Sequence, residues 1–172
     1  MPKINEAVIN YRIFEDASEM IGHASVTLPE ISNMTQEIQG AGIAGTTTAS
    51  IMGHVQAMTM TLNFRTVTES AIRLFEQRRH TIEVRVAQQS RNSSTGVLEV
   101  EGVKYVITIT PTKLAPGNVT PASPADASGE YAVDYYAGYM NGEQLFEVDQ
   151  LNYIFKVNGT DYLAEVRKAL GI

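Results

Sequence analysis

Apolar and polar residues alternate one by one over several parts of the chain. A period of two is typical of strands that bury one face and expose the other. The clearest run spans Met58–Arg65, where Met, Met, Leu and Phe alternate with Thr, Thr, Asn and Arg. The pattern predicts strands at Val8–Phe14, Met20–Leu28, Met58–Arg65, Ile82–Val86 and Val103–Thr110. We expect the first two to pair, and we expect Glu101-Gly102 to turn residues 97–100 back onto the last strand.

A hairpin is predicted near the C-terminus. Asn141-Gly142 separates two strand-like runs, Val133–Met140 and Glu143–Asp149. Both central positions of a type I′ turn need positive φ, which Asn and Gly tolerate best. A two-residue turn would place Met140 opposite Glu143 and Asp134 opposite Asp149. One face would then be mainly apolar, and the other would carry four acids and no base: Asp134, Glu143, Glu147 and Asp149.

Two helices are predicted beside the strands. The first spans about residues 67–79, and Thr66 and Glu69 before and within it have the spacing of a capping box. The second spans about residues 160–170 and is followed by Gly171, which suits the position after a helix end. Strands with two flanking helices and no βαβ pattern predict a mainly β fold.

Two long segments, residues 31–54 and 111–129, show no regular pattern. The first is rich in Gly and Thr, and the second holds four of the six prolines. Loops of this length in a compact domain are usually functional or ordered by a partner. Folded as a hairpin arm, the first segment would reach roughly 35–40 Å, far enough to contact a neighbouring subunit.

Length and composition predict a single domain over residues 1–172. The hydrophobic fraction of 44% suffices for a core, and the absence of Cys excludes disulfides and thiolate chemistry. The first residues lack an apolar signal region, and no run approaches the ~18 apolar residues of a membrane span. We therefore expect a soluble protein made in the cytoplasm.

The net charge of −6 is unlike that of a typical nucleic-acid binder. The charges are also uneven, because residues 65–91 hold six bases and three acids whereas residues 130–149 hold five acids and no base. This is either ordinary surface variation or a pair of faces of opposite sign. Such faces would suit self-assembly or the lining of a channel.

Catalytic and cofactor motifs are weak in this sequence. Residues 40–45 match G-x-G-x-x-G, but the last predicted strand before them ends at Leu28 and no helix start follows, as a dinucleotide site requires. The histidines, His23, His54 and His80, lack metal-ligand spacing and are expected to be ordinary surface or half-buried residues. No Ser lies in G-x-S-x-G. We expect no enzyme, no cofactor and no metal.

The C-terminal segment LFEVDQLNYIFKVNGTDYLAEVRKALGI, residues 145–172, resembles the C-terminus of major tail tube proteins from contractile-tailed bacteriophages. The residues that carry this resemblance are Lys156, Val157, Asn158, Gly159, Asp161, Leu163, Arg167 and Gly171. Toward the other end, the resemblance rests on Phe14-x-Asp16, Gly22, Val26–Pro29 and the glycine loop Gly40–Gly45. It is weakest over residues 111–129.

The resemblance implies a tail tube fold, like a β-sandwich or β-barrel, with a helix on its flank. Six copies would form a ring whose inner sheets join into a continuous β-barrel lumen, and rings would stack into a tube inside a sheath. The implied partners are further copies of the chain, the sheath protein, the baseplate or tube initiator and the tape-measure protein. DNA would pass through without specific binding. The protein would be located in the tail of a virion or of a headless R-type bacteriocin.

Two sets of residues are predicted to serve assembly. The acids Asp134, Glu143, Glu147 and Asp149 are expected to include residues that face the lumen. The loop residues expected to contact the next ring are Gly40, Gly42, Ile43, Gly45, Thr46 and Thr47. The alternatives are a type VI secretion-like tube that carries effectors and a nucleotide-binding enzyme built on the glycine loop.

Overall fold

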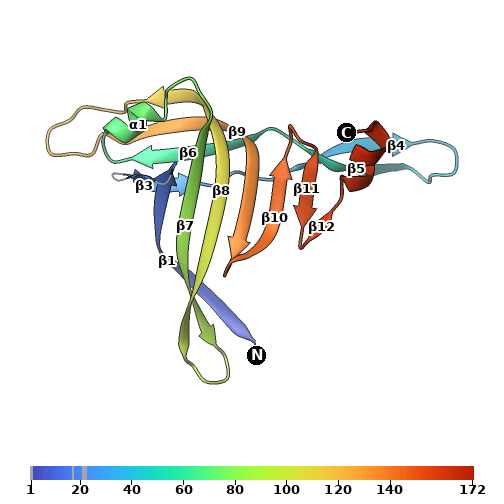
Figure 1. The fold of residues 1–172 in the computed structure, drawn as a ribbon, viewed down its shortest axis with the longest axis horizontal. Helices are drawn as coiled ribbons and strands as arrows, with labels where there is room; N and C mark the ends of the chain where they lie inside the picture. Colours follow the sequence, from blue (N-terminus) through green and yellow to red (C-terminus); the bar gives the residue numbers. More distant parts are fainter. Residues whose placement is uncertain (1, 17, 21–22) are drawn as a thin grey trace.

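The computed structural model describes residues 2–16, 18–20 and 23–172, and it is mainly β, as predicted (Figure 1). Strands hold 60% of the residues and helices 7%. In chain order the elements are β1 (Lys3–Glu15), β2 (Ser18–Met20), β3 (His23–Thr27), β4 (Asn33–Gln39), β5 (Thr46–Val55), β6 (Met58–Phe64), α1 (Glu69–Arg73), β7 (His80–Asn92), β8 (Leu98–Ala115), β9 (Ala127–Met140), β10 (Glu143–Asp149), β11 (Ile154–Val157), β12 (Thr160–Asp161) and α2 (Ala164–Leu170).

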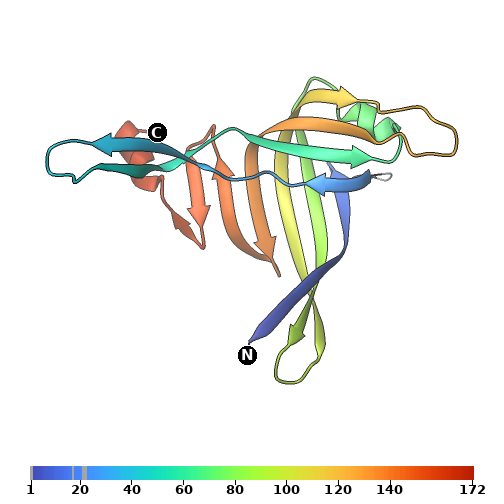
Figure 2. The ribbon, with the colours of Figure 1, turned by 180° about the vertical axis from the view of Figure 1, so that it is seen from behind.

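One large antiparallel sheet forms the body of the protein. Its strands follow the order β12-β11-β10-β9-β8-β7-β1-β2, while β6 pairs with both β9 and β3. The first half of β9 pairs with β6, and its second half pairs with β10. Two opposite views place β6 and β3 over one face of β1 and β7 (Figures 1 and 2). The described strands do not close into a barrel, since the path ends at β2 and β12.

The core lies between these two layers. Met60 and Leu62 of β6, Ile82 of β7 and Ile107 of β8 are completely shielded from solvent. Leu74, at the end of α1, is equally buried. Burial of each such side chain stabilises the fold by about 1.5–3 kcal/mol. The residues that alternate in the sequence therefore do form strands, with their apolar side toward this core.

Strand pairing differs from the sequence prediction in two places. Glu101-Gly102 is not a turn, because β8 runs through it and Gly102 lies opposite Ala87 of β7. The predicted strand over residues 20–28 is divided between β2, which pairs with β1, and β3, which pairs with β6. Residues 21–22, which include Gly22, lie outside the described residues.

Both helices are shorter than predicted. Helix α1 has five residues, and its N-cap is Thr68, whose Oγ1 accepts a hydrogen bond from the Ala71 N–H at 3.2 Å. The predicted cap at Thr66 is therefore wrong. Helix α2 begins only at Ala164, since the two residues of β12 pair with β11. It ends at Gly171, in the left-handed conformation with φ 75°, as predicted.

The two segments predicted to be irregular contain much strand. Residues 33–55 form the hairpin β4–β5, termed the arm, which projects from the body in both views (Figures 1 and 2). The β-branched run Thr46–Thr48 begins β5, as strand propensity favours. The second segment is irregular only over residues 116–126, because β8 and β9 extend into it.

Candidate functional site

The broad sheet has one face packed on the core and one bare face, termed the outer face. The register sets Arg12, Arg85, Lys104 and Tyr139 side by side on this outer face, across β1, β7, β8 and β9. No other described element lies in front of these strands in Figure 1. The outer face is therefore open to solvent in the single subunit and available to a partner or a lumen in an assembly.

The predicted turn at Asn141-Gly142 is present, with φ of 49° and 87°, and Met140 lies opposite Glu143 as predicted, but the predicted register is lost after Gln144. Strand β10 has a bulge between Gln144 and Phe146, and every later pair is shifted by one residue. Phe146 therefore lies opposite Gly138, and its ring meets the edge of Tyr136 at a centroid distance of 4.9 Å.

The bulge separates the four acids that were predicted to share one face. The shifted register places Glu147 and Asp149 on the outer face, whereas Glu143, before the bulge, belongs to the opposite face. Asp134 lies at an irregularity of β9 and forms an ion pair with Arg79, with 3.0 Å between Oδ1 and Nη2. The prediction of one shared acidic face is therefore wrong.

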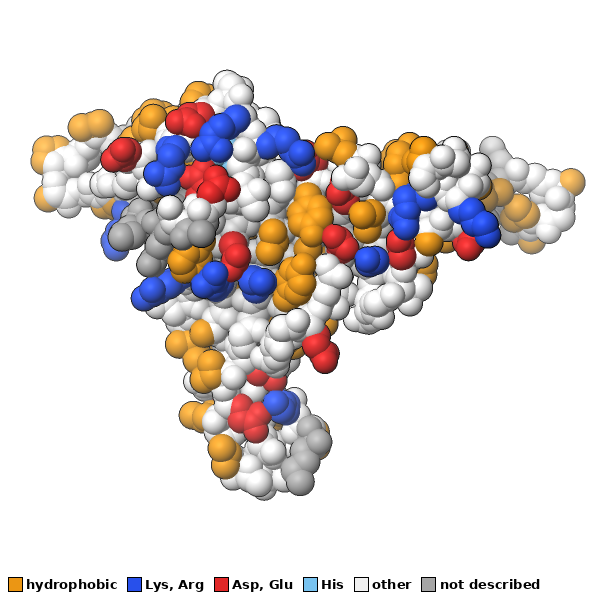
Figure 3. All heavy atoms as spheres, in the orientation of Figure 1, with side chains coloured by type: hydrophobic (Ala, Val, Ile, Leu, Met, Phe, Trp, Pro, Cys, Tyr) orange, Lys and Arg blue, Asp and Glu red, His pale blue; other side chains and the backbone are white. Residues whose placement is uncertain are grey.

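Bases from neighbouring strands stand beside these acids. Lys156 of β11 lies opposite Glu147, with its Nζ 3.6 Å from the carboxylate, and the Tyr135 hydroxyl donates to the same carboxylate at 3.0 Å. Burial, followed by this hydrogen bond, raises the pKa of Tyr135. Figure 3 shows acids and bases mixed over this side of the molecule. The hairpin itself carries no base, as its sequence indicated, and the bases beside its acids belong to neighbouring segments.

An unpredicted blade projects below the body and is formed by the start of β1, the end of β7 and the start of β8 (Figure 1). On one side it exposes Ile4, Leu98 and Val100, each between 53% and 69% accessible. A groove of about 750 Å³ adjoins this side, and Phe14 and Lys104 help to line it. Exposed apolar side chains on a sheet edge mark a contact surface. The sequence did not predict this contact surface at residues 97–100, because Glu101-Gly102 was expected to be a turn that folds them back onto the next strand.

The tip of the arm carries the predicted contact residues. Gly40, Gly42, Ile43, Gly45, Thr46 and Thr47 are all exposed there. Backbone hydrogen bonds from Ile43 N to Gly40 O and from Gly45 N to Ile43 O, both 3.1 Å, close the turn. The G-x-G-x-x-G motif thus joins two antiparallel strands and lacks the helix that a dinucleotide site needs. Along the arm the exposed large apolar residues are Met34, Ile38, Ile43, Ile51 and Met52.

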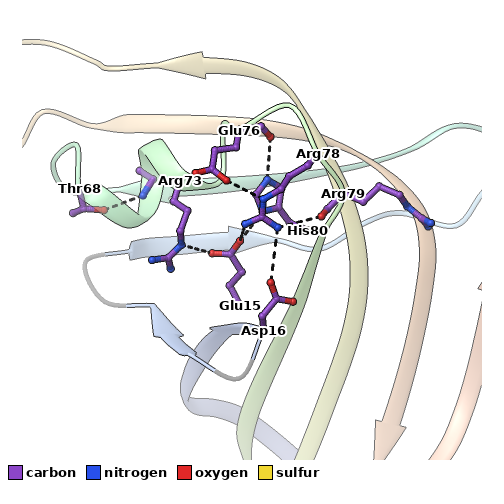
Figure 4. Close-up of polar contacts among 9 residues, drawn as sticks. Glu15, Asp16, Thr68, Arg73, Glu76, Arg78, Arg79 and His80 are labelled. Atoms are coloured by element: carbon purple, nitrogen blue, oxygen red, sulfur yellow. Dashed lines mark hydrogen bonds and ion pairs between the residues drawn. The ribbon is translucent and has the colours of Figure 1, made fainter.

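A buried polar cluster fixes the end of β1 to the segment after α1 (Figure 4). Glu15 is 2% exposed and His80 is fully buried, with 2.5 Å between Glu15 Oε1 and His80 Nδ1. Arg73 Nε donates to the other Glu15 oxygen at 2.8 Å, and His80 Nε2 lies 3.0 Å from the Glu76 carbonyl oxygen. The expectation that His80 is a surface or half-buried residue is therefore wrong.

This cluster makes stability sensitive to acid. Burial alone raises the pKa of Glu15, but hydrogen bonds from Arg73 and His80 outweigh it and lower the pKa below its ordinary value. A group with a depressed folded-state pKa stabilises the fold above its unfolded pKa, and this contribution is lost as pH falls through the folded value.

We expect the free energy of unfolding of the unassembled protein to fall from about pH 5 to pH 3, and Glu15→Gln to remove part of that dependence. Denaturant titrations at each pH measure both. The same pH dependence in the two proteins would contradict the assignment to Glu15.

The comparison with protein families decides the identity of this fold. The family model described as phage tail tube protein FII matches residues 5–171. The chain belongs to this family. It is 26% identical over 152 residues to the tail tube protein of Escherichia phage P2, with 86% of each chain covered. Tail tube proteins are structural components and not enzymes.

Solved structures share the fold of this tail tube protein. The sheath/tube terminator of PVC, an extracellular contractile injection system, matches with a TM-score of 0.55 and 14% identity, covering 79% of this chain and 97% of that one. A chain of the PVC sheath-tube complex matches with a TM-score of 0.50 and 17% identity, covering 75% of this chain and 87% of that one. Among the described residues, none form a three-ligand metal cluster, and no helix is long and apolar enough to cross a membrane.

Proposed function

We propose that this tail tube protein forms hexameric rings that stack into the inner tube of a contractile tail, and that DNA crosses the hollow without specific binding. The observation that carries the proposal is the arm, a projecting hairpin with apolar side chains exposed on it. A two-stranded hairpin is at best marginally stable in water, so such an arm gains stability from a partner. The next ring of the stack supplies that partner.

The tip residues, from Gly40 to Thr47, form the ring-to-ring contact in this proposal. The outer face lines the lumen, and the edges of the sheet join the sheets of neighbouring subunits. Glu147 and Asp149 then face the passing DNA, and Asp134 with its partner Arg79 stands beside them. The ion pairs of Glu147 with Lys156 and of Arg85 with Glu83 reduce the attraction of this face for DNA phosphates, which favours passage over binding, whereas the row of Arg12, Arg85 and Lys104 adds positive charge to it.

The proposed partners are the sheath protein, the baseplate or tube initiator and the tape-measure protein. The protein is made in the cytoplasm of the bacterial host and resides in the tail of the particle. A tube that carries effectors, or one that lets ions through in a bacteriocin, is the second candidate. The likeness to chains of an extracellular contractile injection system favours this second candidate, since those chains share the fold of this protein.

Negative-stain electron microscopy over a concentration series tests the proposal. We expect hollow stacked rings to appear as the concentration rises or when a baseplate initiator is added. Monomers at every concentration, both with and without the initiator, would contradict it.

Placement of the outer face in the lumen has its own test. We expect Glu147→Cys in assembled tubes to react with a small maleimide and to be protected from a bulky polyethylene-glycol maleimide. The unassembled Glu147→Cys protein is the control and should react with both reagents. Because the natural chain has no Cys, all labelling reports this position. Equal reaction of tubes with the bulky reagent would place Glu147 outside the lumen.

A further inference from the structure

We infer that the C-terminal segment sets the direction of the arm. Leu163, the residue before α2, packs against Gly53 of β5, and Gln150 donates a hydrogen bond to the base of the arm at Val55. The importance of this direction for assembly rests on the proposed stacking role of the arm. The direction of the arm itself can be measured on the unassembled subunit.

The contact between Leu163 and Gly53 is close. Leu163 is 4% exposed, although no residue within α2 itself is buried. A Cβ atom at Gly53 would lie 2.3 Å from Cδ2 of Leu163, well inside van der Waals contact. Gly53 also has a φ of 71°, which glycine adopts without strain. Glycine at this position therefore lets the arm bend and lets the leucine seat directly on its backbone.

Hydrogen bonds fix the base of the arm to the body. Gln150, which directly follows β10, donates from Nε2 to the carbonyl oxygens of Val55 and Gln56, both at 3.3 Å. The Gln56 N–H donates to Ser32 O at 2.8 Å and thereby ties the two ends of the arm together. The arm is thus held at its root by Gln150 and, two residues farther out, by Leu163.

The C-terminal segment is itself anchored and can act as a fixed support. Arg167 donates from Nη2 to Asp161 Oδ2 and from Nη1 to the Tyr153 carbonyl oxygen, both at 2.6 Å. Asp161 Oδ1 accepts the Leu163 N–H at 3.1 Å, which orients the leucine. In the described structure, the part of the arm that lies farther from the body than Gly53 forms strand pairs only within its own hairpin. Its direction is therefore decided by the contacts at the root.

Distance measurement between two spin labels tests this inference. Labels on Thr47→Cys in the arm and Thr81→Cys in β7, both exposed, report the direction of the arm in unassembled protein. We expect one narrow distance distribution in the natural background. Leu163→Ala is expected to broaden it and shift its mean. Leu170→Ala is the matched control, since Leu170 is the last residue of α2 and 57% exposed, and it should leave the distribution unchanged.

A second pair of variants keeps the test decisive if Leu163→Ala disturbs folding. Gly53→Ala should also shift the distribution, because its methyl group would displace Leu163. Gly96→Ala is its control, since Gly96 has the same φ of 71° but no atom within 4 Å of the added carbon. An unchanged distribution in both Leu163→Ala and Gly53→Ala would overturn the inference.

The assembly assay separates this inference from the proposed function. If removal of the arm tip leaves tubes intact, the proposed stacking role fails, whatever the spin labels show. If removal abolishes tubes while the arm direction is insensitive to Leu163 and Gly53, only the inference fails. If both hold, Leu163→Ala should raise the protein concentration needed for tubes, and Leu170→Ala should not.

Discussion

Glu15→Ala is expected to lower the free energy of unfolding by about 3 kcal/mol, because it breaks a buried charged cluster. The substitution removes the acceptor of Arg73 and leaves His80 Nδ1, which is fully buried, without its partner. A buried polar group without a partner carries the full cost of its desolvation. Denaturant unfolding of the unassembled subunit measures the change.

The size of this effect follows from the exposure of the partners. Breaking a buried ion pair typically costs 3–5 kcal/mol, so about 3 is the low end of that range. Arg78 is a further partner, with its Nη2 3.4 Å from Glu15 Oε1. The low end is appropriate because the Arg73 and Arg78 side chains are 38% and 44% exposed and can turn toward water. His80 cannot, and we expect it to account for most of the loss.

Glu99→Ala provides the matched control. Glu99 also forms an ion pair, with Lys3 at 2.6 Å, but its side chain is 39% exposed. Exposed pairs contribute about 0–1 kcal/mol, so the same substitution there should cost less than 1 kcal/mol. Similar losses of unfolding free energy in Glu15→Ala and Glu99→Ala would contradict the prediction that burial makes the Glu15 cluster more stabilising than an exposed ion pair.

The hairpin of β9 and β10 shows where sequence reasoning succeeds and where it stops. The turn at Asn141-Gly142 is a local property, because both residues need positive φ, and it was predicted correctly. The bulge after Gln144 is not local. It lets Phe146 fit against Gly138, where a Cβ atom would be 2.3 Å from the ring. Packing therefore decided which face each acid occupies.

The buried cluster and the arm illustrate the same limit. Glu15 and His80 are 65 residues apart in the chain, and only the pairing of β1 with β7 brings the two strands together. Nothing in the spacing of His80 indicated a buried partner. Residues 31–54 were predicted to be irregular, with a hairpin arm considered only for its reach, since glycine and polar residues obscured the alternation between residues 33 and 55. The family resemblance depended on the order of residues along the chain and not on packing. The match of the tail tube family model to residues 5–171 confirmed it.

Removal of Gly40–Thr48 is expected to leave a folded subunit that cannot form tubes. These residues lie at the tip of the arm, and none of them contributes to the core. Far-UV circular dichroism and unfolding measurements should therefore match those of the natural protein. Electron microscopy and sedimentation over a concentration series measure assembly. Tubes of normal length from the shortened protein would contradict the stacking role.

A single substitution at the tip should act in the same direction, and the symmetry of the proposed ring makes its effect large. Ile43→Asp replaces an apolar side chain that is 40% exposed in the subunit, and burial of this remaining surface would contribute roughly 1 kcal/mol per contact. A hexameric ring would lose this contribution six times on stacking, roughly 6 kcal/mol in all, because the contacts form together. Val119→Asp is the control, since Val119 is completely exposed in the loop over residues 116–126 and outside the proposed contact. Tube formation should therefore be lost in Ile43→Asp and retained in Val119→Asp, and an equal loss in both would mean that added charge, not the arm contact, prevents stacking.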